Sequence, residues 1–118
     1  MFTSYFEQMT YTKANAFHTG QQDIAKLAKA LSHPARVAIL EHLAKTRSCI
    51  SGDIAQELPL SRTTVSQHLQ ELKNAGLIKG EIDGLTVCYC INNEAFTEAK
   101  VLMQSFLNTV SAGFDCNC

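Results

Sequence analysis

The chain has 118 residues, the size of a single domain with no room for a separate catalytic module. Hydrophobic residues make up 46% of it, enough for one modest core, which a chain of this size often completes by dimerisation. The net charge of −1 excludes a protein that bulk positive charge alone holds on nucleic acid, because such domains are basic. Nucleic-acid binding would have to depend on the local distribution of side chains.

Neither a membrane span nor a secretory signal is visible in the sequence. The longest apolar run has five residues, at 87–91, whereas a membrane-spanning helix needs about 20. The N-terminus has no basic stretch leading into an apolar one, as a secretory signal would. We therefore expect a cytoplasmic protein with no membrane partner. In that compartment the five cysteines are expected to be thiols or metal ligands, not a disulfide scaffold.

Residues 1–18 are predicted to form an aromatic N-terminal arm. Five of the nine aromatic residues lie there, while Glu7 and Lys13 are its only charged residues. A disordered tail would be poorer in aromatic residues. We therefore expect these rings to pack on a helix of the same subunit or on a partner subunit.

Two helices are predicted from residue 20 onward, separated by Ser32-His33-Pro34. Helical spacing puts four apolar residues on one face of the first helix: Ile24, Leu27, Ala28 and Leu31. Pro34 suits the first turn of the second helix, which is predicted to end near Thr46 and to carry inward Val37, Leu40, Leu43 and Ala44. His33, at the start of this helix, is expected to be structural or solvated and not a metal ligand. A short third helix is predicted from Ser51, as its cap, to about residue 57.

A fourth helix is predicted from an N-cap at Ser61 to a stop at Gly76, with Val65, Leu69 and Leu72 on its inner side. Two extended runs follow, at 77–82 and 85–91, separated by the dipeptide Asp83-Gly84. This dipeptide is typical of a tight hairpin because both residues tolerate positive φ. A last helix begins after Asn92 or Asn93, ends by Gly113 and carries on one side Phe96, Ala99, Met103, Phe106, Leu107 and Val110.

Four helices, a hairpin and a closing helix describe a winged helix-turn-helix. The predicted class is α+β, mainly α, with a two-stranded β wing and a C-terminal dimerisation helix. This domain is expected to cover residues 19–112, and residues 113–118 form a tail that contains a Cys-x-Cys pair.

The outward side of the fourth helix carries hydroxyls, amides and a single guanidinium. These positions are Ser61, Arg62, Thr63, Ser66, Gln67 and Gln70. Such groups donate to and accept from base edges and phosphates in a major groove. Solvated helix faces are usually rich in Glu and Lys, whereas Arg62 is the only charged residue from 61 to 70. The composition therefore favours a surface that reads double-stranded DNA over an ordinary polar face.

Two motifs resemble the ArsR/SmtB family of bacterial metal-sensing repressors. They are LAKALSHPAR at 27–36, followed by Ile39-Leu40, and SRTTVSQHLQEL at 61–72, followed by NAGLI at 74–78. The resemblance covers roughly residues 21–110. It implies a homodimeric winged-helix repressor that leaves its operator when an effector binds.

The resemblance also implies that five positions approach DNA, namely Ser61, Thr63, Ser66, Gln67 and His68. His68 has an alternative, because its spacing from Val65 and Leu72 places it partly inward. A packed, hydrogen-bonded ring is therefore as compatible with the sequence as a base contact.

The predicted wing departs from the family pattern. Family hairpins often carry Arg near the tip, but this tip carries Glu81 and Asp83, with only Lys79 nearby. Two acids facing phosphate would repel it, so we expect the fourth helix to supply most of the affinity for DNA. Zinc sensors of the family place Asp, His and Glu along the last helix. Residues 94–110 contain no His and no Asp, so no zinc site is expected there.

The cysteines form the candidate sensor. Cys49 lies close to where arsenic sensors of the family carry a Cys-Val-Cys motif, which this sequence does not keep. Cys116 and Cys118 bring two sulfurs together on the tail, and with Cys49 they would supply three thiolates to arsenite or another soft metal ion. Cys88 and Cys90 share a strand face opposite the apolar one and are expected to point toward solvent.

Several interpretations stay open at this stage. The leading one is a repressor that needs no cofactor to bind DNA and is released by a thiol-directed effector. Alternatives of the same fold are a thiol redox or persulfide switch, incidental cysteines, and a protein-interaction module that has lost DNA binding. An enzyme is not expected, because the sequence offers neither Cys-x-x-Cys near a strand–helix turn nor a nucleophile with a positioned base.

Overall fold

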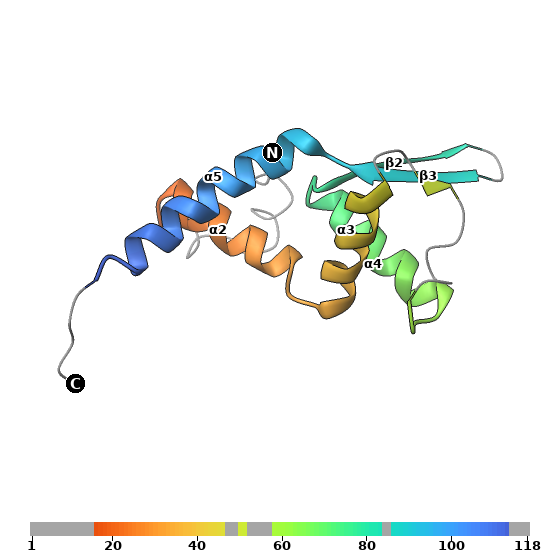
Figure 1. Ribbon diagram of the computed structural model, residues 1–118, viewed down its shortest axis with the longest axis horizontal. Coiled ribbons are helices and arrows are strands. Elements are labelled where there is room, and N and C mark those ends of the chain that lie inside the picture. Colours follow the sequence, from red (N-terminus) through yellow and green to blue (C-terminus); the bar gives the residue numbers. More distant parts are fainter. Residues whose placement is uncertain (1–15, 47–49, 52–57, 84–85, 114–118) are drawn as a thin grey trace.

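The computed structural model describes residues 16–46, 50–51, 58–83 and 86–113 (Figure 1). Along the chain these form α2 (Thr19–Ala30), α3 (Pro34–Thr46), β1 (Ile50–Ser51), α4 (Arg62–Asn74), β2 (Ile78–Asp83), β3 (Thr86–Ile91) and α5 (Asn93–Val110). At one end of the molecule α3 and α4 lie under the β2–β3 hairpin, and at the other end α2 packs on α5 (Figure 1). This is the predicted winged helix-turn-helix. No helix in the described ranges is long and apolar enough to cross a membrane.

Local capping sets the bounds of the helices. The Ser61 hydroxyl accepts from the backbone N–H of Thr64 at 3.2 Å, and the Asn92 side chain accepts from that of Ala95 at 3.3 Å. Each interaction satisfies an amide that has no partner within its own helix. Gly76 follows α4 with φ of 81°, the left-handed conformation that glycine adopts at helix ends. These three predicted boundaries are confirmed.

The α2–α3 corner is also built from the residues that interrupt the helical pattern. The Ser32 hydroxyl donates to the carbonyl of Lys29 at 2.7 Å and so closes the end of α2. His33 begins α3, because its Nδ1 accepts from the N–H of Ala35 at 3.0 Å and its carbonyl accepts from Val37. The expected structural role of His33 is therefore confirmed.

The wing hairpin belongs to a three-stranded antiparallel sheet in the order β1-β3-β2. The two-residue strand β1 pairs Ile50 with Tyr89 and Ser51 with Cys88, because the outer edge of β3 offers unpaired backbone groups. The prediction that Ser51 caps a helix is wrong, because Ser51 lies in the strand β1. The rest of that predicted helix lies outside the described residues.

The hairpin turn lies one residue farther along the chain than predicted, which moves the partner of each β2 residue by two positions on β3. Asp83 pairs with Thr86, so the connection is 84–85 and not Asp83-Gly84. The register is set at the base of the hairpin, where Ile78 is buried and its partner Ile91 packs on the core. A slip of one strand by one residue would turn its own apolar side chains away from the core, whereas the two-residue shift leaves every side chain on its face.

The core is a cluster of aliphatic side chains from every described helix, with Ile39, Leu72 and Leu77 fully buried. The predicted inner side of α4 is confirmed, since Val65, Leu69 and Leu72 are all buried. On α3 the buried stripe runs instead through Ala35, Ile39, Leu40 and Leu43. Because the buried stripe lies on a different side of α3 than predicted, Val37 and Ala44 are exposed and not buried. On α2, Ala28 was also predicted to face inward and is exposed.

The predicted apolar side of α5 is buried only near its start. Ala95 and Ala99 are buried, and Phe96 and Met103 pack partly on the core. Beyond them α5 extends past α2 toward the C-terminus (Figure 1), and the other described elements cover little of this second half. Three apolar residues predicted inward are therefore exposed: Phe106, Leu107 and Val110.

Candidate nucleic-acid interface

The outward side of α4 keeps its predicted polar residues at the surface. Six positions are exposed, namely Ser61, Arg62, Thr63, Ser66, Gln67 and Gln70. Behind them Val65 is 3% exposed and Leu72 is fully buried, so the core fixes which side of the helix faces outward. We call the six exposed residues the α4 face.

The start of α4 is well suited to a phosphate. Exposed Ser61, Arg62 and Thr63 stand at the N-terminal end of a 13-residue helix, where the backbone dipole attracts anions. The Ser61 hydroxyl is already engaged, since it accepts from Thr64 N–H and donates to the Thr64 hydroxyl at 2.9 Å. Farther along, the Gln70 amide donates to the Asn74 side chain at 3.0 Å. Between Ser61 and Gln70 the exposed side chains of the α4 face are Arg62, Thr63, Ser66 and Gln67.

His68 does not belong to the α4 face. Its side chain is 9% exposed, and its Nδ1 accepts from Nε of Arg36 at 3.2 Å. The ring also lies against that of His33, with centroids 4.5 Å apart and planes tilted by 44°. Of the two alternatives for His68, the packed and hydrogen-bonded ring describes its position.

Burial lowers the pKa of His68 below its usual 6.5, and the nearby His33 and Arg36 lower it further, while Glu71 acts in the opposite direction. The neutral ring is thus the favoured form in the fold. Sequence reasoning did not single out Arg36, the hydrogen-bond partner of His68. Arg36 belongs to the motif at 27–36, and His68 belongs to the motif at 61–72. No pattern within either motif indicates that these two residues are in contact.

Less of the surface of the wing than of the α4 face is described by the structure. Lys79 is exposed on β2, while the side chains of Glu81 and Asp83 lie outside what the structure describes. Gly80 pairs with Tyr89 across the hairpin, and a Cβ at Gly80 would overlap the Tyr89 ring. The glycine therefore allows this ring to lie over the hairpin and pack on the core.

The predicted sensor cysteines lie outside the described residues: Cys49, Cys116 and Cys118. Cys88 and Cys90 are described and are half-buried on β3, not open to solvent as expected. The reason is that β3 is the central strand, with β1 and β2 on either side. Among the residues that the structure covers, no group of three or more His, Cys, Asp or Glu side chains could hold a metal ion.

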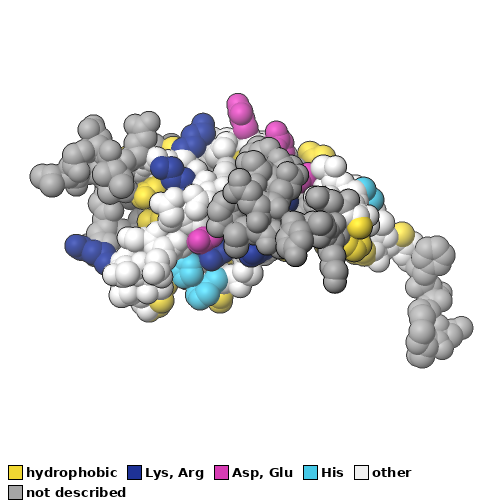
Figure 2. Space-filling view, turned by 180° about the vertical axis from the view of Figure 1, so that it is seen from behind, with side chains coloured by type: hydrophobic (Ala, Val, Ile, Leu, Met, Phe, Trp, Pro, Cys, Tyr) yellow, Lys and Arg dark blue, Asp and Glu magenta, His cyan; other side chains and the backbone are white. Residues whose placement is uncertain are grey.

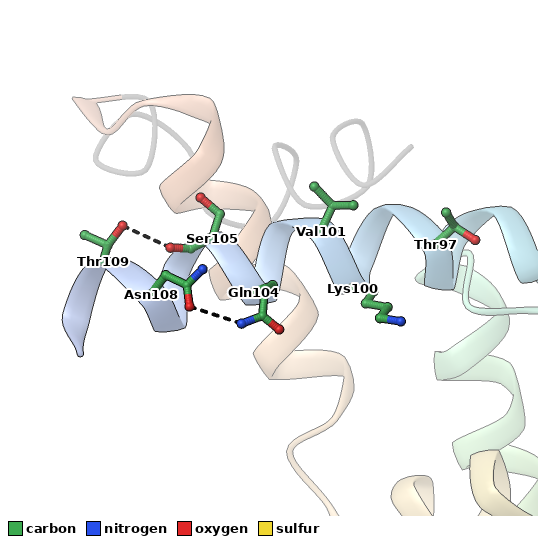
Figure 3. A pocket seen from close by; sticks show the side chains of 7 residues that line it. All are labelled: Thr97, Lys100, Val101, Gln104, Ser105, Asn108 and Thr109. Atoms are coloured by element: carbon green, nitrogen blue, oxygen red, sulfur yellow. Dashed lines mark hydrogen bonds between the residues drawn. The ribbon is translucent and has the colours of Figure 1, made fainter. Parts of the chain in front are cut away.

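Two further surfaces lie on α5. A shallow groove of about 760 Å³ runs along one side and is lined by seven residues of α5, among them Thr97, Val101, Gln104 and Asn108 (Figure 3). The Gln104 amide donates to Asn108 along the helix at 3.1 Å. The other surface is apolar, where Phe106, Leu107 and Val110 are 42%, 48% and 65% exposed. Figure 2 shows hydrophobic side chains exposed toward this C-terminal end of the molecule.

A helix with a buried back and an exposed polar front, followed by a β hairpin, defines a winged helix-turn-helix DNA-binding domain. Residues 31–81 match a family model described as a helix-turn-helix domain. The HTH-type transcriptional regulator YgaV of Escherichia coli is 33% identical over 84 residues, which cover 71% of this chain and 85% of that protein. The transcriptional repressor PagR of Bacillus anthracis is 38% identical over 72 residues, which cover 61% of this chain and 72% of that protein.

A solved structure agrees with these relatives. The homodimeric winged helix-turn-helix DNA-binding domain of a possible ArsR-family transcriptional regulator from Mycobacterium bovis has a TM-score of 0.55 and 26% identity, covering 82% of this chain and 90% of that one. The chain belongs to the ArsR/SmtB family of winged helix-turn-helix transcriptional regulators.

Proposed function

We propose that the protein is a homodimeric repressor that binds double-stranded operator DNA through the α4 face. The observation that carries this proposal is the exposure of all six polar residues on a helix whose other side is locked into the core. PagR, a relative of similar length, is named as a transcriptional repressor.

Each part of the α4 face has its own role in this proposal. The start of the helix, with Ser61 and Thr63, receives a phosphate and sets the position of the protein on the duplex. Arg62 and Gln67 reach base edges, where Arg pairs with guanine and Gln with adenine. Ser66 and Gln70 supply additional polar contacts along the groove. A net positive charge on the whole chain is not required for this arrangement, because Arg62 and the oriented backbone and side-chain dipoles supply the attraction locally.

Dimerisation uses the apolar surface at the end of α5. Phe106, Leu107 and Val110 are exposed in the single subunit, and a second copy would remove them from water. The M. bovis neighbour is described as homodimeric. In a dimer, two α4 helices would enter successive major grooves about 34 Å apart on a near-palindromic site.

The effector is proposed to be arsenite or another soft metal ion acting on thiols, with no cofactor needed for DNA binding. The tail pair Cys116 and Cys118, together with Cys49, would supply three sulfur ligands. Binding would release DNA by favouring a dimer geometry that no longer fits the operator.

The test is binding of the reduced, full-length protein to labelled duplex DNA from upstream of its own gene, followed by fluorescence anisotropy at several salt concentrations. The expected result is selective binding relative to a scrambled duplex, with an affinity that falls as salt rises. Arsenite is then titrated into the complex, and release is expected. Absence of salt-sensitive binding at every concentration would overturn the repressor proposal in favour of a protein-interaction module.

A further inference from the structure

A cluster formed by Arg36, His33 and His68 joins three helices behind the α4 face. Arg36 lies in the first turn of α3, and its Nε donates to Nδ1 of His68 in the middle of α4 at 3.2 Å. The same guanidinium donates through Nη1 to the carbonyls of Lys29 and Ala30 at 3.3 and 3.4 Å. One side chain thus connects the last turn of α2 with the helix that carries the DNA-binding surface.

The hydrogen bond from Arg36 defines where the neutral His68 ring carries its proton. His68 Nδ1 accepts from Arg36, and His33 Nδ1 accepts from the N–H of Ala35. A neutral imidazole has one acceptor and one donor nitrogen, so the neutral His68 ring carries its proton on Nε2. A second proton on His68 would have to occupy Nδ1, where it would face the N–H of the guanidinium. The hydrogen bond between α3 and α4 would then lose its acceptor.

The charges around His68 oppose that second proton. Within the described part of the chain, the groups that act on the ring are His33 and Arg36, from the start of α3, and Glu71, on the next turn of α4. Burial, His33 and Arg36 disfavour the imidazolium, and Glu71 favours it. The disfavouring effects are larger, which is why the pKa of His68 lies below its usual value.

We propose that Arg36 and His68 are a positioning pair that sets α4 against the α2–α3 corner, and that protonation of His68 releases this pair and weakens operator binding. The inference rests on the proposed function. Since α2 packs on α5, the helix proposed to form the dimer, the bond from Arg36 also fixes the α4 face relative to the dimer axis. Two half-sites bind together only if both α4 helices hold that orientation.

The direction of the pH effect separates this mechanism from general electrostatics. Acidification protonates histidines and makes the protein more positive, which by itself strengthens attraction to phosphate. Release of the positioning pair has the opposite effect. A decrease in affinity at low pH therefore reports on the cluster.

The experiment measures affinity of the full-length protein for the labelled upstream duplex from about pH 8 to about pH 5.5 at constant ionic strength. We expect the wild-type affinity to fall on acidification once the pH reaches the lowered pKa of His68, by at most tenfold per pH unit for each proton taken up. The His68→Asn variant keeps an acceptor, Oδ1, in place of Nδ1 but does not titrate. Its affinity is expected to match the wild type at pH 8 and to stay flat on acidification.

The matched control is His42→Asn, which removes a half-buried histidine of α3 and should keep the wild-type pH dependence. A wild-type affinity that stays constant or rises through the pH at which an NMR titration shows His68 taking up its proton would overturn the proposal, as would an unchanged pH dependence in His68→Asn. Absence of binding by the wild type at pH 8 would instead contradict the proposed function.

A measurement without DNA keeps the positioning pair testable in that case and also if His68→Asn does not fold. In the free wild-type protein, an NMR titration follows the His68 ring, the Arg36 Nε–H and the backbone amides of α4. The Arg36 signal and the α4 amides should change with the same midpoint as His68. An Arg36 signal that is unaffected by protonation of His68 would overturn the pairing.

Discussion

Arg36 and His68 are 32 residues apart in the chain, yet Nε of one lies 3.2 Å from Nδ1 of the other. Each belongs to one of the two motifs that resemble the ArsR/SmtB family, at 27–36 and 61–72. The first motif therefore does more than turn the chain between α2 and α3. Ser32 closes α2, His33 begins α3, and Arg36 reaches the helix that carries the second motif.

The pKa of His68 predicts how folding stability depends on pH. Because the folded pKa lies below the usual 6.5, the unfolded chain binds more protons than the folded chain between these two values. The free energy of unfolding should therefore fall as the pH drops below about 6.5 and level off below the folded pKa. Urea unfolding of wild type and His68→Asn at three pH values isolates this contribution as the difference between the two proteins. A difference that does not vary with pH would contradict the assignment.

The α4 face predicts a loss of affinity that leaves the fold unchanged. Replacing Arg62 and Gln67 by Ala removes two groups proposed to contact base edges, at about 1–3 kcal/mol for each bidentate contact. Both residues are exposed, so stability should change little. Anisotropy with the upstream duplex measures the affinity, and light scattering measures the mass of the protein. Gln104→Ala on α5 is the matched control, since it removes an exposed amide far from the α4 face in the chain. Unchanged affinity in the double variant would remove α4 from the reading role.

Features of the fold that depend on neighbouring residues could be predicted from the sequence. Ser61, Gly76 and Asn92 each end or begin a helix through contacts within a few residues, and such contacts leave a local signature. The spacing of the apolar residues also predicted which side of α4 is buried, because Val65, Leu69 and Leu72 recur at helical spacing.

Features that depend on distant segments could not be predicted in this way. On α3 both Val37 and Ile39 are apolar, and only packing against α4 and the sheet decides that Ile39 is buried. The strand β1 has two residues, too few for a pattern, and exists because β3 offers it an edge. The contact of Arg36 with His68 likewise depends on how α3 and α4 cross. The α4 face was accessible to sequence reasoning, whereas its attachment to the α2–α3 corner was not.

The apolar surface of α5 predicts a dimer that one added charge disrupts. Val110 is 65% exposed in the single subunit, so Val110→Asp should cost little within the subunit. Burying an unpaired carboxylate in an interface is costly, and the variant should therefore be monomeric at concentrations where the wild type is dimeric. Asn108→Asp is the matched control, since it adds the same charge to the same helix at a residue that lines the groove. Light scattering gives the mass of each variant. Dimerisation of Val110→Asp with wild-type affinity would show that another surface forms the dimer.

The last prediction concerns the thiols. Replacing Cys116 and Cys118 by Ser should abolish the release of DNA by arsenite and leave the DNA affinity in its absence unchanged, because the tail is not part of the α4 face. Cys88→Ser with Cys90→Ser is the matched control, since it removes two thiols at the same spacing from the half-buried central strand and should keep the response. Anisotropy during an arsenite titration of the reduced complexes compares the variants. Release that persists without the tail thiols would place the sensor elsewhere. Release by an oxidant that arsenite does not reproduce would favour a redox or persulfide switch, which needs two sulfurs in bonding distance and not three around one ion.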